Sequence, residues 1–305
     1  MLGLVWVARK AITAEIDPAI SEAISLGFIP KFIDLLKNIN DNEIRVEILW
    51  SLSNIAGNKD EYTNIIRETD IQYFIIELIK TCSLEVKEKS LWVLGNILAN
   101  NIEMRDKLLT TSLLETLYQI FYSIEIPKQL IDSAIWVFSN LTQGKPSPPL
   151  DKFTRFFPLL KSLLKSESKS TVNDTLWTIS YLTDRNVEAV NILADYIDFP
   201  LIIKSIASNN INDIIPALRI IGNVCTTDNG EIVRKIYQLN TLEILQQLLK
   251  DQTMENLHKE ACWVLSNIAM GPSECLIQFF DCQLFSLLIT YSLTYPNQCV
   301  LYFTT

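Results

Sequence analysis

The sequence has few of the residues from which metal sites and disulfide frameworks are built. Six cysteines occur in 305 residues without forming a CxxC pair, and His258 is the only histidine. This pattern favours reduced thiols packed in a core, and it predicts neither a metal site nor a cofactor. The cysteines are Cys82, Cys225, Cys262, Cys275, Cys282 and Cys299.

Sequence signatures of catalysis are missing as well. No G-x-S-x-G, P-loop or G-x-G-x-x-G segment occurs in the chain. The carboxylate pairs Asp41/Glu43 and Glu85/Glu88 are typical of helix N-termini and of charge that faces solvent. We therefore expect that the chain is not an enzyme and has no catalytic residue.

Glycine and long apolar runs are scarce. Only eight glycines occur, although 49% of the residues are hydrophobic, which favours continuous helix packing. No stretch reaches the roughly 18 apolar residues that a membrane helix needs. A net charge of −9 and a sequence pI of about 4.8 repel phosphate backbones and anionic membranes and attract basic ligands. We expect no nucleic-acid or membrane partner.

The chain does contain a tryptophan that recurs at intervals of 42, 44 and 41 residues, followed four residues later by a polar side chain. A final interval of 86 residues holds two periods, and an arginine takes the tryptophan position midway. On a helix, residues i and i+4 share one face, so each pair offers an apolar plate beside a hydrogen-bonding group. Such pairs suit an extended peptide. The pairs are Trp50/Asn54, Trp92/Asn96, Trp136/Asn140, Trp177/Tyr181, Arg219/Asn223 and Trp263/Asn267.

A period of roughly 40 to 47 residues is typical of armadillo and HEAT solenoids. Each period repeats a three-helix pattern, and the second predicts helices over 60–68, 71–81 and 84–98, of which the last carries the Trp/Asn pair. We therefore predict an all-α single domain over residues 1–305. Its expected repeats are 16–58, 59–100, 101–145, 146–185, 186–228 and 229–271, with partial repeats at 1–15 and 272–305.

Eight segments in the same order resemble importin alpha, the armadillo-repeat adaptor of nuclear import. PALRIIGNV from Pro216 and HKEACWVLSNIA from His258 are the most specific. The resemblance implies a right-handed superhelical solenoid of three-helix repeats that binds nuclear localisation signals of cargo proteins, in the cytoplasm and nucleus. The other segments are ARK from Ala8, GFIPKFIDLL from Gly27, LWSLSNIAG from Leu49, LWVLGNI from Leu91, IWVFSNLTQGKPSPP from Ile135 and LWTISYLTD from Leu176.

The resemblance also implies a set of peptide-binding residues. Asparagine amides would hold the peptide backbone, and indoles would flank basic side chains at about 0.5 to 2 kcal/mol per contact. Arg219 has two explanations, a competitor of cargo or an internal ion pair, and the second is favoured. The major site comprises Trp50, Asn54, Thr63, Trp92, Asn96, Trp136, Asn140, Asp174, Trp177 and Tyr181; the minor site comprises Arg219, Asn223, Glu260, Trp263 and Asn267.

A structural explanation competes with this one at each tryptophan, because a single tryptophan at helical spacing usually belongs to a core. Core packing explains the indole but gives no reason for a polar partner four residues later, repeated along the chain. We therefore favour a peptide-binding surface for the set as a whole.

Two positions depart from the importin alpha pattern. Asn100 stands where the family has an aspartate that receives the critical lysine of the signal, and Lys89 stands where it usually has glutamine. Both changes make the major site less negative. The sequence therefore predicts weakened binding of classical lysine-rich signals.

The ends depart from the family as well. The chain begins inside the first repeat without a basic run, so we expect the importin-beta-binding arm and the last repeats to be absent. Its closing segment, 291–305, loses the repeat pattern. A fragment, a non-functional truncated paralogue or a non-import armadillo scaffold with another extended ligand are alternatives to a complete import adaptor.

Overall fold

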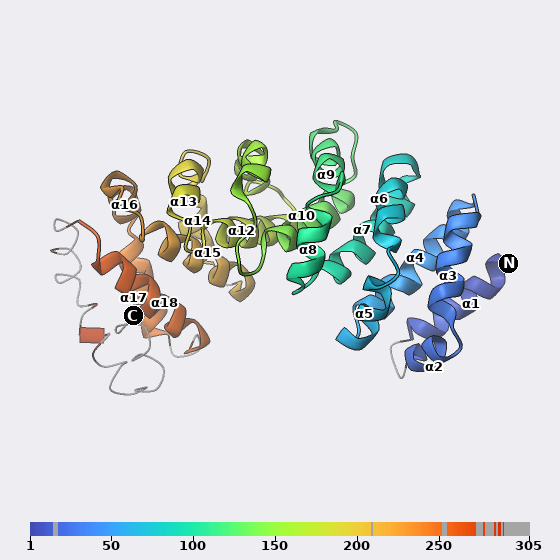
Figure 1. The fold of residues 1–305 in the computed structure, drawn as a ribbon. Helices are drawn as coiled ribbons and strands as arrows, with labels where there is room; N and C mark the ends of the chain where they lie inside the picture. Colours follow the sequence, from blue (N-terminus) through green and yellow to red (C-terminus); the bar gives the residue numbers. More distant parts are fainter. Residues whose placement is uncertain are drawn as a thin grey trace. The chain divides into compact units, whose positions relative to one another are not determined.

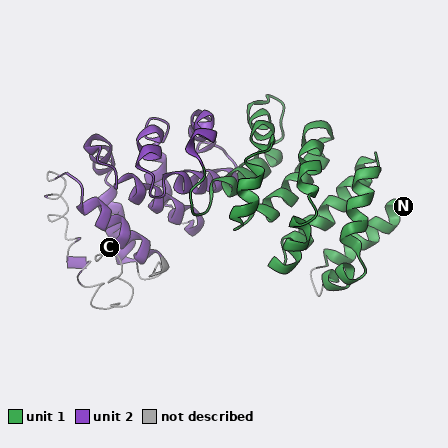
Figure 2. Cartoon of the chain, viewed as in Figure 1, with its two compact units in different colours: residues 1–148 green, residues 149–305 purple. Residues whose placement is uncertain are grey.

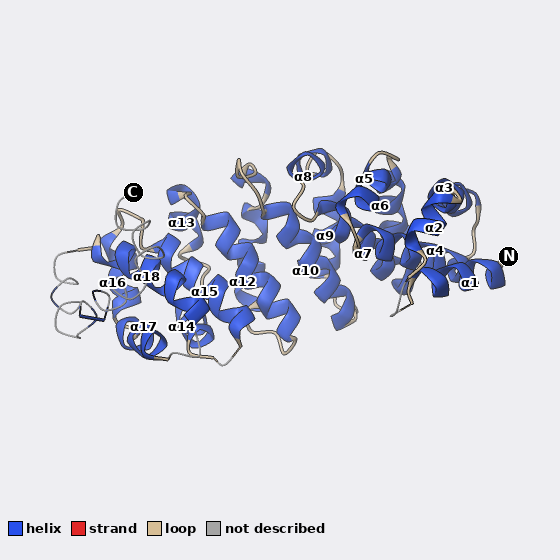
Figure 3. Ribbon diagram, turned by 90° about the horizontal axis from the view of Figure 1, so that it is seen from below, coloured by secondary structure: helices blue, strands red, loops and turns tan. Residues whose placement is uncertain are grey.

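The computed structural model describes residues 1–14, 18–208, 210–251 and 255–272, together with residues 277, 284, 286, 287 and 289. These residues form α-helices and two short 3-10 helices, with no strand in the part described (Figure 3). The chain divides into two compact units, residues 1–148 and 149–305 (Figure 2). The boundary falls in the proline-rich run 144–149.

Unit 1 consists of three successive groups of three helices, preceded by one further helix (Figure 1). In each group two shorter helices precede a third of 15 residues. The helices are α1 (Leu2–Ile12); α2 (Ile20–Ser25), α3 (Phe28–Asn38) and α4 (Asn42–Ala56); α5 (Asp60–Arg67), α6 (Ile71–Thr81) and α7 (Leu84–Leu98); α8 (Ile102–Leu108), α9 (Leu113–Tyr122) and α10 (Lys128–Thr142).

Unit 2 repeats the pattern. Its first group begins with two 3-10 helices in place of a first α-helix. The elements are η1 (Leu150–Lys152), η2 (Thr154–Phe156), α11 (Phe157–Leu163) and α12 (Lys169–Thr183); α13 (Val187–Leu193), α14 (Phe199–Ile206) and α15 (Ile211–Val224); α16 (Gly230–Tyr237), α17 (Thr241–Lys250) and α18 (Glu255–Ala269).

The helix boundaries follow from local sequence. The predicted helices 60–68, 71–81 and 84–98 are confirmed as α5, α6 and α7, within one residue. The carboxylate of Asp41 accepts hydrogen bonds from the amides of Glu43 and Ile44 and so caps α4, as expected for a helix N-terminus. Asn101 caps α8 in the same way.

The third helices form the spine of each unit. In unit 1, α1, α4, α7 and α10 pack in series, and in unit 2 α12 packs on α15 and α15 on α18. The second helices α6 and α14 cover α7 and α15. A third helix is therefore enclosed on several sides, which explains why its apolar positions mix spacings of three and four residues.

The thiol prediction is correct for two cysteines and wrong for a third. Cys225 and Cys262 are buried and not in a disulfide, whereas Cys82, also not in a disulfide, is partly exposed because it follows the last residue of α6. Cys275, Cys282 and Cys299 lie outside the described residues, as does the closing segment 291–305. Among the described residues, no helix is long and apolar enough to span a membrane, and no three His, Cys, Asp or Glu residues gather as a metal site would require.

Candidate peptide-binding surface

The predicted pairs lie on the third helices. In unit 1, α4 carries Trp50 and Asn54, α7 carries the second pair and α10 the third, and all six side chains are half-buried. In unit 2 the three remaining pairs lie on the third helices α12, α15 and α18. There, only Asn223 is fully buried, at 5% exposure. We call the twelve residues of the six pairs the ladder.

The ladder asparagines of unit 1 join neighbouring third helices. Asn96 Nδ2 donates to the main-chain carbonyl of Ser53 at 2.8 Å and to its hydroxyl at 3.1 Å. Asn140 Nδ2 donates to the carbonyl of Gly95 at 3.2 Å. Each acceptor precedes the ladder asparagine of the previous repeat. Asn54 is the exception, since its amide donates to the carbonyl of Trp50 within its own helix.

The same bond recurs in unit 2. Asn223 Nδ2 donates to the carbonyl of Ser180 and to the hydroxyl of Thr183, both at 3.1 Å. Asn267 Nδ2 donates to the carbonyl of Gly222 at 3.0 Å. A hydrogen bond of this kind contributes about 1 kcal/mol. In both units the ladder amides therefore hold successive repeats together.

These bonds correct one step of the sequence argument. Packing does account for the polar partner at four of the six pairs, because each of these asparagines donates to a carbonyl on the preceding third helix; they are Asn96, Asn140, Asn223 and Asn267. An amide has two N–H donors and an oxygen that accepts two bonds. Among the described residues, no hydrogen bond reaches the Oδ1 atoms of Asn54, Asn96, Asn140 and Asn267. Those oxygens, on half-buried side chains, are available to a peptide N–H.

The ladder indoles rest on small residues of the preceding helix. A Cβ atom added to Gly95 would lie 2.1 Å from the Trp136 ring, and one added to Gly222 would lie 2.2 Å from the Trp263 ring. These glycines thus admit an indole where any other residue would collide with it. The sequence carries a signal for this feature, because in every pair a small residue directly precedes the second, polar residue. The six are Ser53, Gly95, Ser139, Ser180, Gly222 and Ser266.

A third contact comes from the residue three positions before the ladder indole, which reaches back to the preceding third helix. Ser133 of α10 accepts a hydrogen bond from Trp92 Nε1 at 3.1 Å. Glu47 of α4 pairs with Arg9 of α1, whose guanidinium lies 4.4 Å from the Trp50 ring centroid. This position therefore sets the charge beside each indole.

In α7 this position is Lys89, and it is 8% exposed. Its ammonium lies 3.4 Å from the centroid of the Trp92 ring and 5.0 Å from that of the Trp50 ring. Glu88 Oε2 is 3.5 Å away. A cation of the chain itself therefore contacts two consecutive ladder indoles.

In unit 2 a cation, Arg219 of α15, stands at the tryptophan position itself. Its ion pair with Glu260 of α18 confirms the internal ion pair expected for it. Its guanidinium donates to Glu260 at 2.9 and 3.4 Å and lies 5.4 Å from the Trp177 ring centroid. The hydrogen bond with Glu260 raises the pKa of Arg219. Tyr181 stacks on Trp177 with centroids 5.4 Å apart, and burial raises the pKa of its phenol. Here the chain's own charges are paired.

The structure also places two further predicted residues, Thr63 and Asp174. Thr63, on α5, is 3% exposed, and its hydroxyl lies 2.7 Å from the carbonyl oxygen of Ala56 and 3.0 Å from that of Lys59. Asp174 is half-buried on α12, one turn before Trp177. Their roles in holding a peptide stay predictions.

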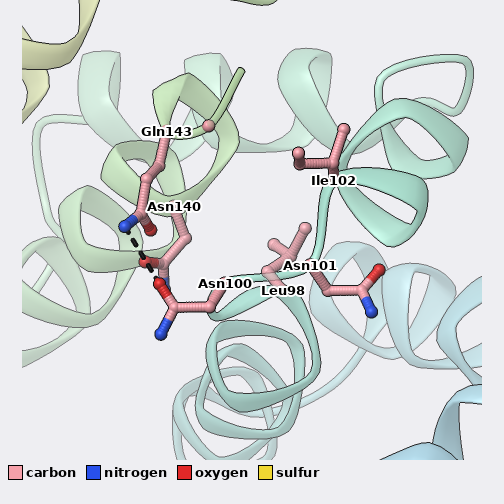
Figure 4. Close-up of a pocket in the computed structure, with 7 residues that line it drawn as sticks. Leu98, Asn100, Asn101, Ile102, Asn140 and Gln143 are labelled. Carbon is pink, nitrogen blue, oxygen red and sulfur yellow. Dashed lines mark hydrogen bonds between the residues drawn. The ribbon is translucent and has the colours of Figure 1, made fainter. Parts of the chain in front are cut away.

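Asn100 borders a pocket of about 160 Å³ in unit 1 (Figure 4). Its backbone has a positive φ of 52°, and its Oδ1 accepts a hydrogen bond from Gln143 Nε2 at 3.1 Å. No charged residue lines the pocket, so it presents carboxamides where an acid would attract lysine. The lining residues are Leu98, Asn100, Asn101, Ile102, Asn140, Gln143 and Gly144.

Comparison with known proteins places the chain among armadillo-repeat proteins. Residues 17–57 match the armadillo/beta-catenin-like repeat family. Importin subunit alpha-1b of rice is 28% identical over 84% of this chain and 47% of its own length; importin subunit alpha-3 of Arabidopsis thaliana is 28% identical over 84% and 48%. This chain is an armadillo-repeat protein related to importin alpha. It spans about half the length of the curated relatives it matches.

Solved structures agree on the fold of this importin-alpha-related protein. An engineered protein superposes with a TM-score of 0.78 at 20% identity, covering 97% of this chain and 76% of that protein. A designed armadillo repeat protein in complex with the peptide (KR)4 superposes with a TM-score of 0.65 at 21% identity, covering 79% and 99%. The predicted all-helical armadillo solenoid is confirmed, and the relationship supports the prediction that the chain is not an enzyme.

Proposed function

We propose that this protein binds extended, predominantly basic peptide segments along its third helices, as an adaptor for nuclear localisation signals of cargo proteins. One observation carries the proposal: half-buried indoles recur on consecutive packed helices, each beside a polar side chain, and four of the asparagines have an Oδ1 that accepts no bond within the described residues. The ladder therefore repeats the same pair of groups along the chain, and its free amide oxygens can accept hydrogen bonds from the main-chain N–H groups of a peptide.

The dimensions suit a peptide. Packed helices lie about 8 to 10 Å apart, and an extended chain rises about 3.3 Å per residue, so each step of the ladder spans two to three peptide residues. An amide oxygen accepts a peptide N–H whatever the side chain, while an indole face flanks the methylene stem of lysine or arginine. The net charge of −9 attracts such ligands.

The relatives suggest the setting. The two compared above are importin alpha subunits, and a designed armadillo repeat protein with the same fold is in complex with the peptide (KR)4. We accordingly propose cargo proteins with basic signals as ligands, and the cytoplasm and nucleus as the location. Thr63 and Asp174 are included in the proposed site together with the ladder and Glu260.

A non-import scaffold that binds another extended ligand is the second candidate. The uncharged pocket beside Asn100 favours it, because the pocket lacks the negative charge that would select lysine. In that case the ladder would bind main chain without preference for basic residues.

Fluorescence anisotropy separates the two candidates. The full chain is titrated into a labelled lysine-rich signal peptide, a bipartite signal and a neutral peptide of equal length, at 50 and 300 mM salt. The adaptor predicts binding of the basic peptides that weakens as salt rises, because screening reduces charge attraction. Equal binding of all three, insensitive to salt, would contradict the adaptor and support the scaffold.

A further inference from the structure

The slot between Trp50 and Trp92 already holds a cation. The Lys89 ammonium is within cation–π distance of both rings, at 5.0 and 3.4 Å, and the residue is 8% exposed. Cation–π attraction extends to about 6 Å from a ring centroid. The two faces that would flank a basic ligand side chain are thus occupied by a side chain of α7.

The charge of Lys89 is incompletely compensated. An ammonium carries three N–H donors. Among the described residues, its charged partner is Glu88, at 3.5 Å, and no hydrogen bond from Nζ is found. By contrast, Arg219 makes two hydrogen bonds to Glu260. Lys89 consequently has donors left for a ligand oxygen, whereas Arg219 has its charge matched by its own chain.

The pocket at the C-terminal end of α7 does not supply a preference for cations either. Its lining includes Asn100, Asn140 and Gln143, and no charged side chain (Figure 4). A second ammonium entering beside Lys89 would meet a like charge, and the carboxylate within ion-pair distance, Glu88, is already the partner of Lys89. Like charges destabilise each other strongly where water is excluded.

We infer that Lys89 is a built-in occupant of this slot and inverts the charge preference there: the peptide residue that reaches the Trp50–Trp92 slot carries a carboxylate, not an ammonium. The ligand of unit 1 is then an extended peptide with an acidic residue at one position of an otherwise basic segment. Lys89 donates to the carboxylate, and the indoles contact its methylene groups. This inference rests on the proposed function.

A positional scan tests it. Labelled octapeptides built from alternating lysine and serine carry Lys, Ala or Glu at one position at a time, and each is titrated by anisotropy into the full chain. Wild type, Lys89→Gln and Lys87→Gln are compared. The last is a matched control, because it removes one positive charge from α7 but lies two residues away, on another face of the helix.

Wild type should prefer Glu over Lys at one peptide position by at least five-fold and prefer Lys elsewhere. Lys89→Gln should reverse that single preference, and Lys87→Gln should change it by less than two-fold. A preference for Lys at every position in wild type, or a Glu preference unchanged by Lys89→Gln, overturns this inference alone. If no peptide binds wild type or Lys89→Gln, both folded by circular dichroism, the proposed function fails and this inference with it.

Discussion

The two units form the same contacts between their third helices but differ in the charged residues that lie beside the indoles. In both, a ladder amide bonds to the preceding helix and an indole rests on a glycine. In unit 2 Glu260 neutralises Arg219, and in unit 1 Glu47 neutralises Arg9 in the same way. At the next step of unit 1, however, Lys89 brings an incompletely compensated positive charge to the Trp50 and Trp92 rings. The helix packing and the charge beside the indoles are therefore set by different residues.

This difference depends on one position, three residues before the ladder indole. Its side chain reaches the preceding helix in both units, and Glu260 and Lys89 occupy it in α18 and α7. A solenoid can thus keep its spine while the charge of each step changes with a single residue.

The largest effect is expected where indole and glycine meet. Gly95→Ala and Gly222→Ala should each destabilise the protein by about 1 to 3 kcal/mol, because the new methyl group collides with a tryptophan ring. The measurement is urea unfolding followed by circular dichroism. Gly3→Ala is the control: it lies in α1, and nothing is within 4 Å of the added atom. Since alanine favours helix by about 1 kcal/mol, the control should be neutral or stabilising. Stabilisation by Gly95→Ala would refute the contact.

An intermediate effect is expected for the amide bonds. Asn96→Ala should cost about 1 kcal/mol of unfolding free energy, because it removes the bond to Ser53 on the preceding helix. Asn54→Ala should cost less, since Asn54 bonds only within α4. If the ladder also binds peptide, both variants should weaken peptide binding. An equal loss of stability in the two variants would contradict the distinction between them.

The smallest effect on stability concerns the divergent position. Glu260→Gln should cost about 0.5 to 1 kcal/mol, because it weakens a half-exposed ion pair, and a double-mutant cycle with Arg219→Gln should assign that energy to the pair. Lys89→Gln should leave stability nearly unchanged, because losing the loose ion pair with Glu88 and two cation–π contacts is offset by removing a buried charge. A coupling energy of zero between Arg219 and Glu260 would remove the contrast between the units.

Much of this molecule could be predicted from the sequence. The tryptophan period located the third helices, since a repeat imposes the same burial pattern each time, and α5, α6 and α7 matched within one residue. The amide bonds could not be predicted, because their acceptors are main-chain carbonyls about 43 residues earlier, which no side chain reveals. The small residues before Asn96 and Asn223 were visible but were not related to the indole of the next repeat.

The position of Lys89 shows a further limit. The sequence identified it as a charge change, and only the geometry shows that its ammonium contacts two indoles. The environment of the Thr63 side chain likewise depends on the fold, because its hydroxyl contacts the carbonyls of Ala56, at the end of α4, and Lys59, just before α5, and the residue is buried.

The central claim, that the ladder is the ligand surface, is tested most directly by comparing Trp92→Ala with Tyr73→Ala. Both aromatic rings hold an ammonium of the chain, Lys89 over Trp92 and Lys107 over Tyr73, but Tyr73 lies on the second helix α6, away from the ladder. With the tightest-binding octapeptide of the positional scan in anisotropy titrations, Trp92→Ala should weaken binding at least ten-fold and Tyr73→Ala less than two-fold. Equal effects of the two variants, or tight binding by folded Trp92→Ala, would contradict the claim.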